Sequence, residues 1–72
     1  MKSEKELIEM NDKSHVLSYY PNAYIKWDIL YTIHANSSEL KTEMGGDVIG
    51  YGILKSEAWM YAKQWVLNNQ TK

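Results

Sequence analysis

The stretch over residues 23–36 alternates between apolar and polar residues, and this alternation constrains the fold more than any other feature of the chain. Its central odd positions are Trp27, Ile29, Tyr31 and Ile33. Because successive side chains of a strand point to opposite faces, a period of two predicts a strand with one buried and one open face. Helical spacing would scatter the same residues around a cylinder. We therefore expect one long strand whose odd positions are buried, with a bulge or bend near Trp27 and Asp28.

Two shorter segments continue the β pattern. Residues 39–44 alternate again, and the pair Gly45-Gly46 is a hairpin signal because a primed turn needs positive φ. Residues 47–54 then return as a third strand. Within it, Gly50 and Gly52 indicate a bulge or the close approach of another backbone. These segments predict a three-stranded antiparallel meander.

Helical patterns flank the strands. Ser3 and Glu6 fit a capping box, so we expect a helix over residues 4–13, followed by a turn or a short helical piece to Tyr20. Pro21 ends the helical segment in either case, since it lacks an N–H donor and restricts the residue before it.

The second helix is expected over residues 57–69, with Ser56 as its N-cap. Ala58 and Ala62 fall on its apolar face, where small side chains let a helix lie close to a sheet. The larger residues of the same face fill volume; they are Trp59, Trp65 and Val66. The whole chain, residues 1–72, is thus predicted to be one α+β domain, α-β-β-β-α, with both helices packed on one face of the sheet.

Composition limits the classes of function. Eight Lys and nine Asp or Glu give a net charge of -1, which provides no general attraction to nucleic acid or anionic lipid. The chain has no cysteine, so it offers neither disulfides nor thiolate metal ligands. The charged N-terminal segment lacks the apolar core of a secretion signal, and no run approaches the ~20 apolar residues of a membrane span. We expect a cytoplasmic protein without cofactor or metal.

The element order and the segment Gly50-Tyr51-Gly52 before an alanine-bearing helix resemble the double-stranded-RNA-binding domain. That resemblance implies a scaffold of the same topology. The chain departs from the family where the family contacts RNA. Lys55 is followed by Ser56 and Glu57 instead of a lysine cluster, and residues 36–39 lack the Pro-His element. RNA binding is therefore not carried over from this family.

A second set of short motifs resembles that of small phage- and prophage-encoded proteins. These proteins carry a "YP-x-A … G-x-G … AW-x-x-A" pattern and have no assigned activity. In this chain the pattern is formed by residues 20–23, by residues 50–52 and by the segment from Ala58 to Ala62. The resemblance implies an origin in a mobile element and does not imply a mechanism.

No group of residues has the spacing of a catalytic or metal site. His34 and Asp28 share the even face of the predicted strand, but six strand residues separate them by roughly 20 Å. His15 has no second histidine at metal-ligand spacing. We expect both histidines to be surface residues, and we predict that the chain is not an enzyme.

Aromatic residues are in surplus for so small a chain, and several tyrosines cannot all be buried. Tyrosine is favoured at protein contacts because it offers a large contact area at low entropy cost. Tyr24, Leu30 and His34 share the open face of the predicted strand, so we predict that they bind a protein partner, either a second copy of the chain or a host factor. The alternative is a nucleic-acid-binding module built on the scaffold of the double-stranded-RNA-binding domain.

Overall fold

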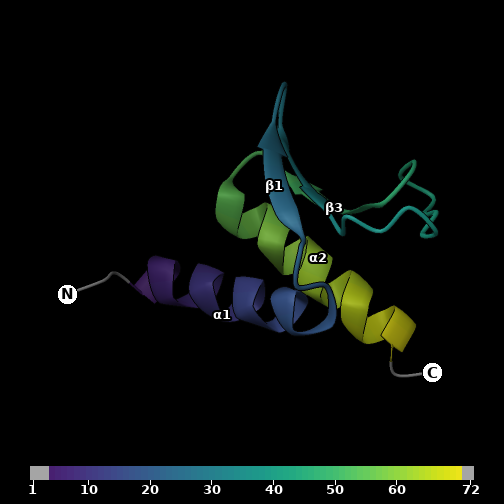
Figure 1. Cartoon of the computed structure of the whole chain (residues 1–72). Helices are drawn as coiled ribbons and strands as arrows, with labels where there is room; N and C mark the ends of the chain where they lie inside the picture. Colours follow the sequence, from purple (N-terminus) through teal and green to yellow (C-terminus); the bar gives the residue numbers. More distant parts are fainter. Residues whose placement is uncertain (1–3, 71–72) are drawn as a thin grey trace.

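The computed structural model describes residues 4–70, with side chains from residue 10 to residue 69. The elements in chain order are α1 (Glu4–Tyr19), β1 (Tyr24–Trp27), β2 (Tyr31–His34), β3 (Val48–Gly52) and α2 (Lys55–Gln70). The strands form one antiparallel sheet in the order β1-β2-β3 (Figure 1). The predicted α-β-β-β-α architecture with a three-stranded antiparallel meander is confirmed.

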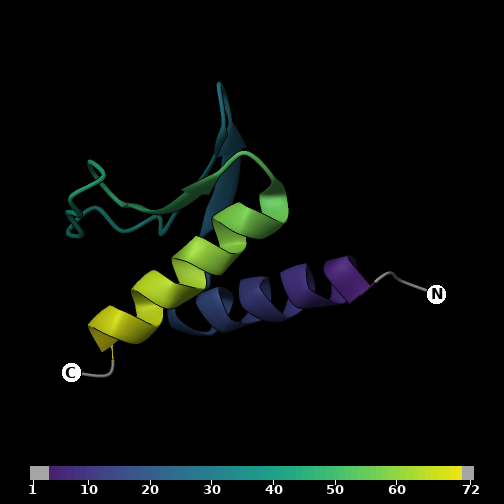
Figure 2. The same ribbon diagram turned by 180° about the vertical axis from the view of Figure 1, so that it is seen from behind.

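Helix α2 is the centre of the packing. It lies across β2 and β3, and α1 packs against α2, as both views of the ribbon show (Figures 1 and 2). The core forms around α2, which packs against α1 on one side and against β2 and β3 on the other; it consists of Val16, Ile33, Ala35, Ile49, Ala58, Trp59, Ala62 and Val66. The predicted apolar face of the last helix is therefore confirmed for its alanines, for Trp59 and for Val66, while Trp65 is half-buried.

The contact between β3 and α2 depends on two glycines. A Cβ placed on Gly50 would lie 2.6 Å from the carbonyl oxygen of Ala58 and 2.6 Å from the nitrogen of Ala62. A Cβ on Gly52 would lie 2.8 Å from the nitrogen of Ala58. These neighbours are backbone atoms that cannot rotate away, so only glycine allows this approach. The predicted close approach at both glycines is confirmed, and a register irregularity in β3 opposite Ile33 adds the bulge.

The predicted long strand is wrong as a single element. The chain turns back at residues 28–30, where the N–H of Asp28 donates to the carbonyl of Leu30 at 3.0 Å. The strands on either side pair with each other, from Tyr24 opposite His34 to Trp27 opposite Tyr31. Folding back lets the two halves pair their backbone groups with each other.

Burial along this hairpin also differs from the prediction. Ile33 is fully buried and Tyr31 is half-buried, but Trp27 is 66% exposed and Ile29 is 92% exposed. The hairpin end that carries these two residues projects beyond both helices in Figures 1 and 2. Odd positions are therefore buried only where α2 covers the sheet, and the expectation that Trp27 and Ile29 belong to the core is wrong.

Residues 39–44 do not form a strand. They belong to a long loop between β2 and β3 that is held by turns, including a bond from the N–H of Thr42 to the carbonyl of Gly46 at 2.9 Å. The expected turn at Gly45 and Gly46 is present, with φ of 102° and 54°. The alternation predicted the exposure pattern, since Leu40, Thr42 and Met44 are half-buried between exposed neighbours. The alternation did not predict the backbone conformation, because hydrogen bonds within turns replace the pairing between strands here.

Both helices are longer than predicted. Helix α1 continues without a break to Tyr19, and Pro21 follows its end as expected. Within this continuous helix, Asp12 is buried and pairs with Lys63 of α2 at 3.4 Å. Helix α2 begins at Lys55, so Ser56 is not its cap; the Glu57 carboxylate accepts the N–H of Leu54 at 3.1 Å. Among the described helices, none has the length and apolar character needed to cross a bilayer.

Candidate interaction surface on the open face of the sheet

The open face of the sheet brings Tyr24 and His34 together. They are directly opposite each other in the pairing of β1 with β2, so their side chains lie on the same face. Their rings are stacked, with centroids 5.0 Å apart and planes inclined by 6°. Tyr24 is 45% exposed, whereas the ring of His34 is largely covered. Two of the three predicted partner-binding residues thus form one contact.

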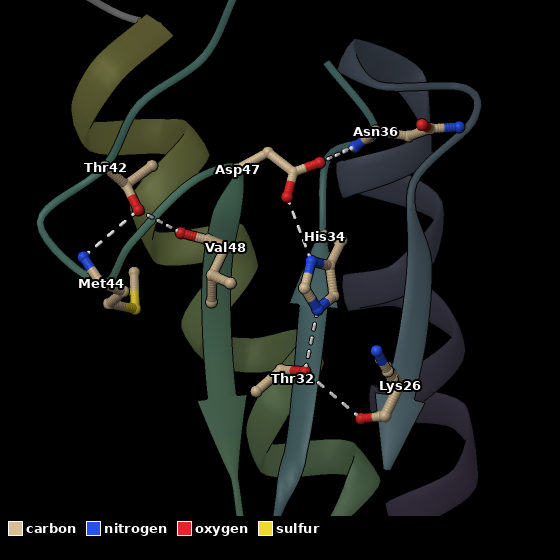
Figure 3. Close-up of polar contacts among 8 residues, drawn as sticks. All are labelled: Lys26, Thr32, His34, Asn36, Thr42, Met44, Asp47 and Val48. Atoms are coloured by element: carbon tan, nitrogen blue, oxygen red, sulfur yellow. Dashed lines mark hydrogen bonds and ion pairs between the residues drawn. The ribbon is translucent and has the colours of Figure 1, made fainter. Parts of the chain in front are cut away.

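His34 also joins two polar side chains (Figure 3). Its Nδ1 lies 3.1 Å from Oδ1 of Asp47, and its Nε2 lies 3.1 Å from Oγ1 of Thr32. A carboxylate only accepts hydrogen bonds, so Nδ1 carries the proton and donates to Asp47. In the neutral ring, Nε2 then accepts from the Thr32 hydroxyl. In the protonated ring, Nε2 donates, and the hydroxyl can turn its proton to the carbonyl of Lys26, 3.4 Å away.

Asp47 fastens the base of the long loop. Its Oδ2 accepts the N–H of Asn36 at 2.9 Å, and its carbonyl accepts the N–H of Ala35 at 3.0 Å. Asn36 adopts a φ of 60°, a conformation that Asn tolerates better than most residues. Burial would raise the pKa of Asp47, but the hydrogen bonds from His34 and from the Asn36 N–H outweigh burial and hold that pKa below its ordinary 3.8. The ionised carboxylate therefore closes the loop at both of its ends.

Thr32, His34 and Asp47 have the hydroxyl–imidazole–carboxylate order of catalytic triads. The Tyr24 ring covers one face of the imidazole, and none of the three residues lines the groove beside β3 and α2 that is described below. The contacts of Asp47 with His34, Asn36 and Ala35 close the loop between β2 and β3, whereas Thr32 links His34 to β1.

Leu30 lies apart from the other two predicted residues. It is half-buried within the turn that joins β1 to β2, at the opposite end of the hairpin from Tyr24 and His34. The most exposed large apolar side chains of the hairpin are its neighbours Trp27 and Ile29. Neither was predicted as an exposed residue, because the periodicity placed both on the covered face. Asp47 was not predicted as the partner of His34, although it immediately precedes the strand that pairs with His34.

A groove lies on another side of the molecule, between the outer edge of β3 and one flank of α2. It has a volume of about 700 Å³. Its apolar lining includes Tyr51, Ile53, Met60, Tyr61 and Trp65. The rings of Tyr51 and Tyr61 contact each other across it, with centroids 4.8 Å apart. None of the three predicted partner-binding residues lines this groove.

Within the described residues, no three His, Asp or Glu side chains gather closely enough to hold a metal ion. Comparison with protein families, with curated proteins and with solved structures gives no match for this chain.

Proposed function

We propose that this chain is a small, non-enzymatic binding protein that engages a protein partner through the aromatic surface of its β1–β2 hairpin. The observation that carries the proposal is the exposure of Trp27 and Ile29, at 66% and 92%, on a hairpin end that stands clear of both helices (Figures 1 and 2). The partner is a second copy of the chain or a protein of its host. The proposed location is the cytoplasm, and the phage-like pattern remains a prediction about origin.

The energetics of burial support this proposal. Covering an exposed Ile or a comparable apolar side chain contributes about 1.5–3 kcal/mol, and Trp and Tyr are frequent anchors of protein interfaces. Trp27 is partly held in place by an edge contact with Tyr31, with ring centroids 6.4 Å apart. A pre-oriented aromatic ring loses less conformational entropy on binding. Tyr24, at the base of the hairpin, adds an exposed aromatic ring on the opposite face of the strands, and Leu30 lies next to Ile29 in the turn.

The test is a double variant, Trp27→Ser with Ile29→Ser. Its free energy of unfolding should change by no more than about 0.5 kcal/mol, because exposed side chains contribute little to stability. Self-association in light scattering, or capture of the host partner, should be lost. Tyr19→Ser is the matched control, since Tyr19 is an exposed aromatic residue on α1, outside the hairpin. A double variant that still associates, or that loses binding only in proportion to unfolded protein, would contradict the proposal.

Binding to nucleic acid is the competing outcome. A retention assay with RNA and DNA at low salt separates the two classes, because phosphate contacts weaken as salt rises while apolar burial does not. Salt-sensitive retention that survives the hairpin double variant would favour the nucleic-acid-binding module instead.

A further inference from the structure

We propose that the groove beside β3 binds an extended peptide that carries lysine or arginine side chains, and that this peptide adds to β3 as a fourth strand. The proposal concerns a different surface from the β1–β2 hairpin and does not depend on the proposed function. Three observations carry it: the free edge of β3, the wall that α2 forms beside that edge, and the charge of the groove.

The outer edge of β3 is covered only at its beginning. Val48 is capped by the long loop, since its N–H donates to the carbonyl of Gly45 at 3.2 Å and its carbonyl accepts the hydroxyl of Thr42. Beyond that point, β3 is the last strand of the sheet, and no described element pairs with its edge at Tyr51 or Gly52. Natural proteins usually cover or blunt such edges. An open edge beside a helix is the arrangement that binds extended peptides by strand addition.

The glycines of β3 bring the wall of the groove close to the strand. Because Gly50 and Gly52 admit the α2 backbone, the helix lies against the strand and its flank rises directly beside the free edge. Met60 and Trp65 are contributed by this flank. The volume of about 700 Å³ lies within the ~300–1,000 Å³ typical of ligand pockets, enough for the side chains of a short peptide segment.

The charge of the lining selects the class of peptide. The charged side chains that line the groove are both carboxylates, Glu43 from the long loop and Glu57 from the first turn of α2. The aromatic rings of the lining can receive a cation over their faces, a contact worth about 0.5–2 kcal/mol depending on exposure. Gln64 and Asn68 also line the groove and add amide groups that can bond to a peptide. Basic side chains therefore complement this surface, and acidic ones are repelled by it.

The probe for the experiment is a displayed library of random octapeptides, selected on the immobilised full chain. The expected result is enrichment of peptides with lysine or arginine at alternate positions, as side chains on one face of an added strand require. A selected peptide is then synthesised and titrated against Gln64→Lys and Glu43→Lys. Both positions are exposed, so folding should be retained, and each change should weaken binding at least tenfold. Glu39→Lys is the matched control, because it makes the same change in the same loop outside the groove.

A second peptide tests strand addition directly. Methylation of alternate backbone nitrogens on the side that faces β3 removes the donors of the added ladder, and it should abolish binding, whereas methylation of the other set should not. No enrichment, enrichment without basic residues, or binding unchanged in Gln64→Lys would overturn the proposal. A concentration-dependent dimer that is lost in Gln64→Lys would also overturn it, since a second copy would then occupy the edge. The Trp27→Ser, Ile29→Ser variant should bind the peptide normally, which separates this test from that of the hairpin.

Discussion

The contact between α2 and β3 and the free end of the β1–β2 hairpin differ in side-chain size and in burial. At the first, backbones lie so close that a single Cβ on Gly50 would collide with Ala58 and Ala62. At the second, Trp27 and Ile29 extend into solvent. Two of the largest apolar side chains of the hairpin thus lie outside the core, while glycine and alanine form the closest backbone contact within it. A side chain of the sheet is buried where α2 can approach the strands. Its apolar character alone does not determine its burial.

The largest effect is expected at the closest contact. Gly50→Val should cost about 3 kcal/mol or more, because the new side chain meets helix backbone that cannot move without separating α2 from the sheet. Thermal and urea unfolding followed by circular dichroism measure it. Gly45→Ala is the comparison, since no atom lies within 4 Å of its Cβ and only its φ of 102° opposes the change; about 1 kcal/mol is expected. Equal losses would mean that space is not limiting at Gly50.

Two isoleucines of one hairpin should differ sharply. Ile33→Ala should cost about 2–5 kcal/mol through lost burial and a cavity, whereas Ile29→Ala should stay within about 0.5 kcal/mol. Urea unfolding of both variants under one condition gives the difference. A large loss at Ile29 would place the hairpin end in the core and would contradict its exposure to solvent.

Loss of the Asp47 carboxylate, which closes the loop between β2 and β3, should lower stability by an intermediate, pH-dependent amount. Asp47→Asn should cost about 1–2 kcal/mol at neutral pH, because the charged acceptor of the His34 and Asn36 hydrogen bonds is lost. The lowered pKa of Asp47 means that its contribution is present above about pH 3.8 and disappears as the pH falls through the folded value. The gap between wild type and variant should therefore narrow below pH 3.8. Glu39→Gln, at an exposed carboxylate, should show no such gap.

The smallest effect on stability is expected at Tyr24, where the base of the hairpin contacts His34. Tyr24→Ser removes the ring stacked on His34 and should cost about 0.5–1 kcal/mol, while Tyr24→Phe keeps the stack and should be nearly neutral. Thermal unfolding of the two variants measures the difference. If Tyr24→Ser unfolds the protein far more easily, then the base of the hairpin belongs with the core and not with its exposed end.

The sequence could predict the order of elements, but it could not locate the turn in the first β segment. Trp27 pairs with Tyr31 and Ile25 pairs with Ile33, so odd positions face odd positions across the turn. A three-residue turn therefore leaves the alternation intact, and periodicity cannot distinguish a hairpin from one long strand. Burial escaped prediction for a related reason, since the extent of the sheet that α2 covers is a tertiary property.

The candidate site was predictable only in part. Tyr24 and His34 were correctly expected on one face, because even positions share that face on both sides of the turn. The hydrogen bond between His34 and Asp47 depends on the register between β2 and β3. The long loop between these strands prevents that register from being predicted from the sequence. The close approach at Gly50 and Gly52 was predictable, since a glycine within a strand usually marks a bulge or the close approach of another backbone.

The packing of α1 on α2 has a consequence for how the chain is made. Val16 and Val66, one in each helix, are fully buried in the same core. Ribosomal synthesis produces α1 first and α2 last, so the apolar face of α1 has no packing partner until α2 emerges. The β1–β2 hairpin depends on contacts close in sequence and can form much earlier. Completion of the core therefore waits for α2, and a nascent chain stalled before α2 would expose α1 and the sheet together to chaperones and proteases.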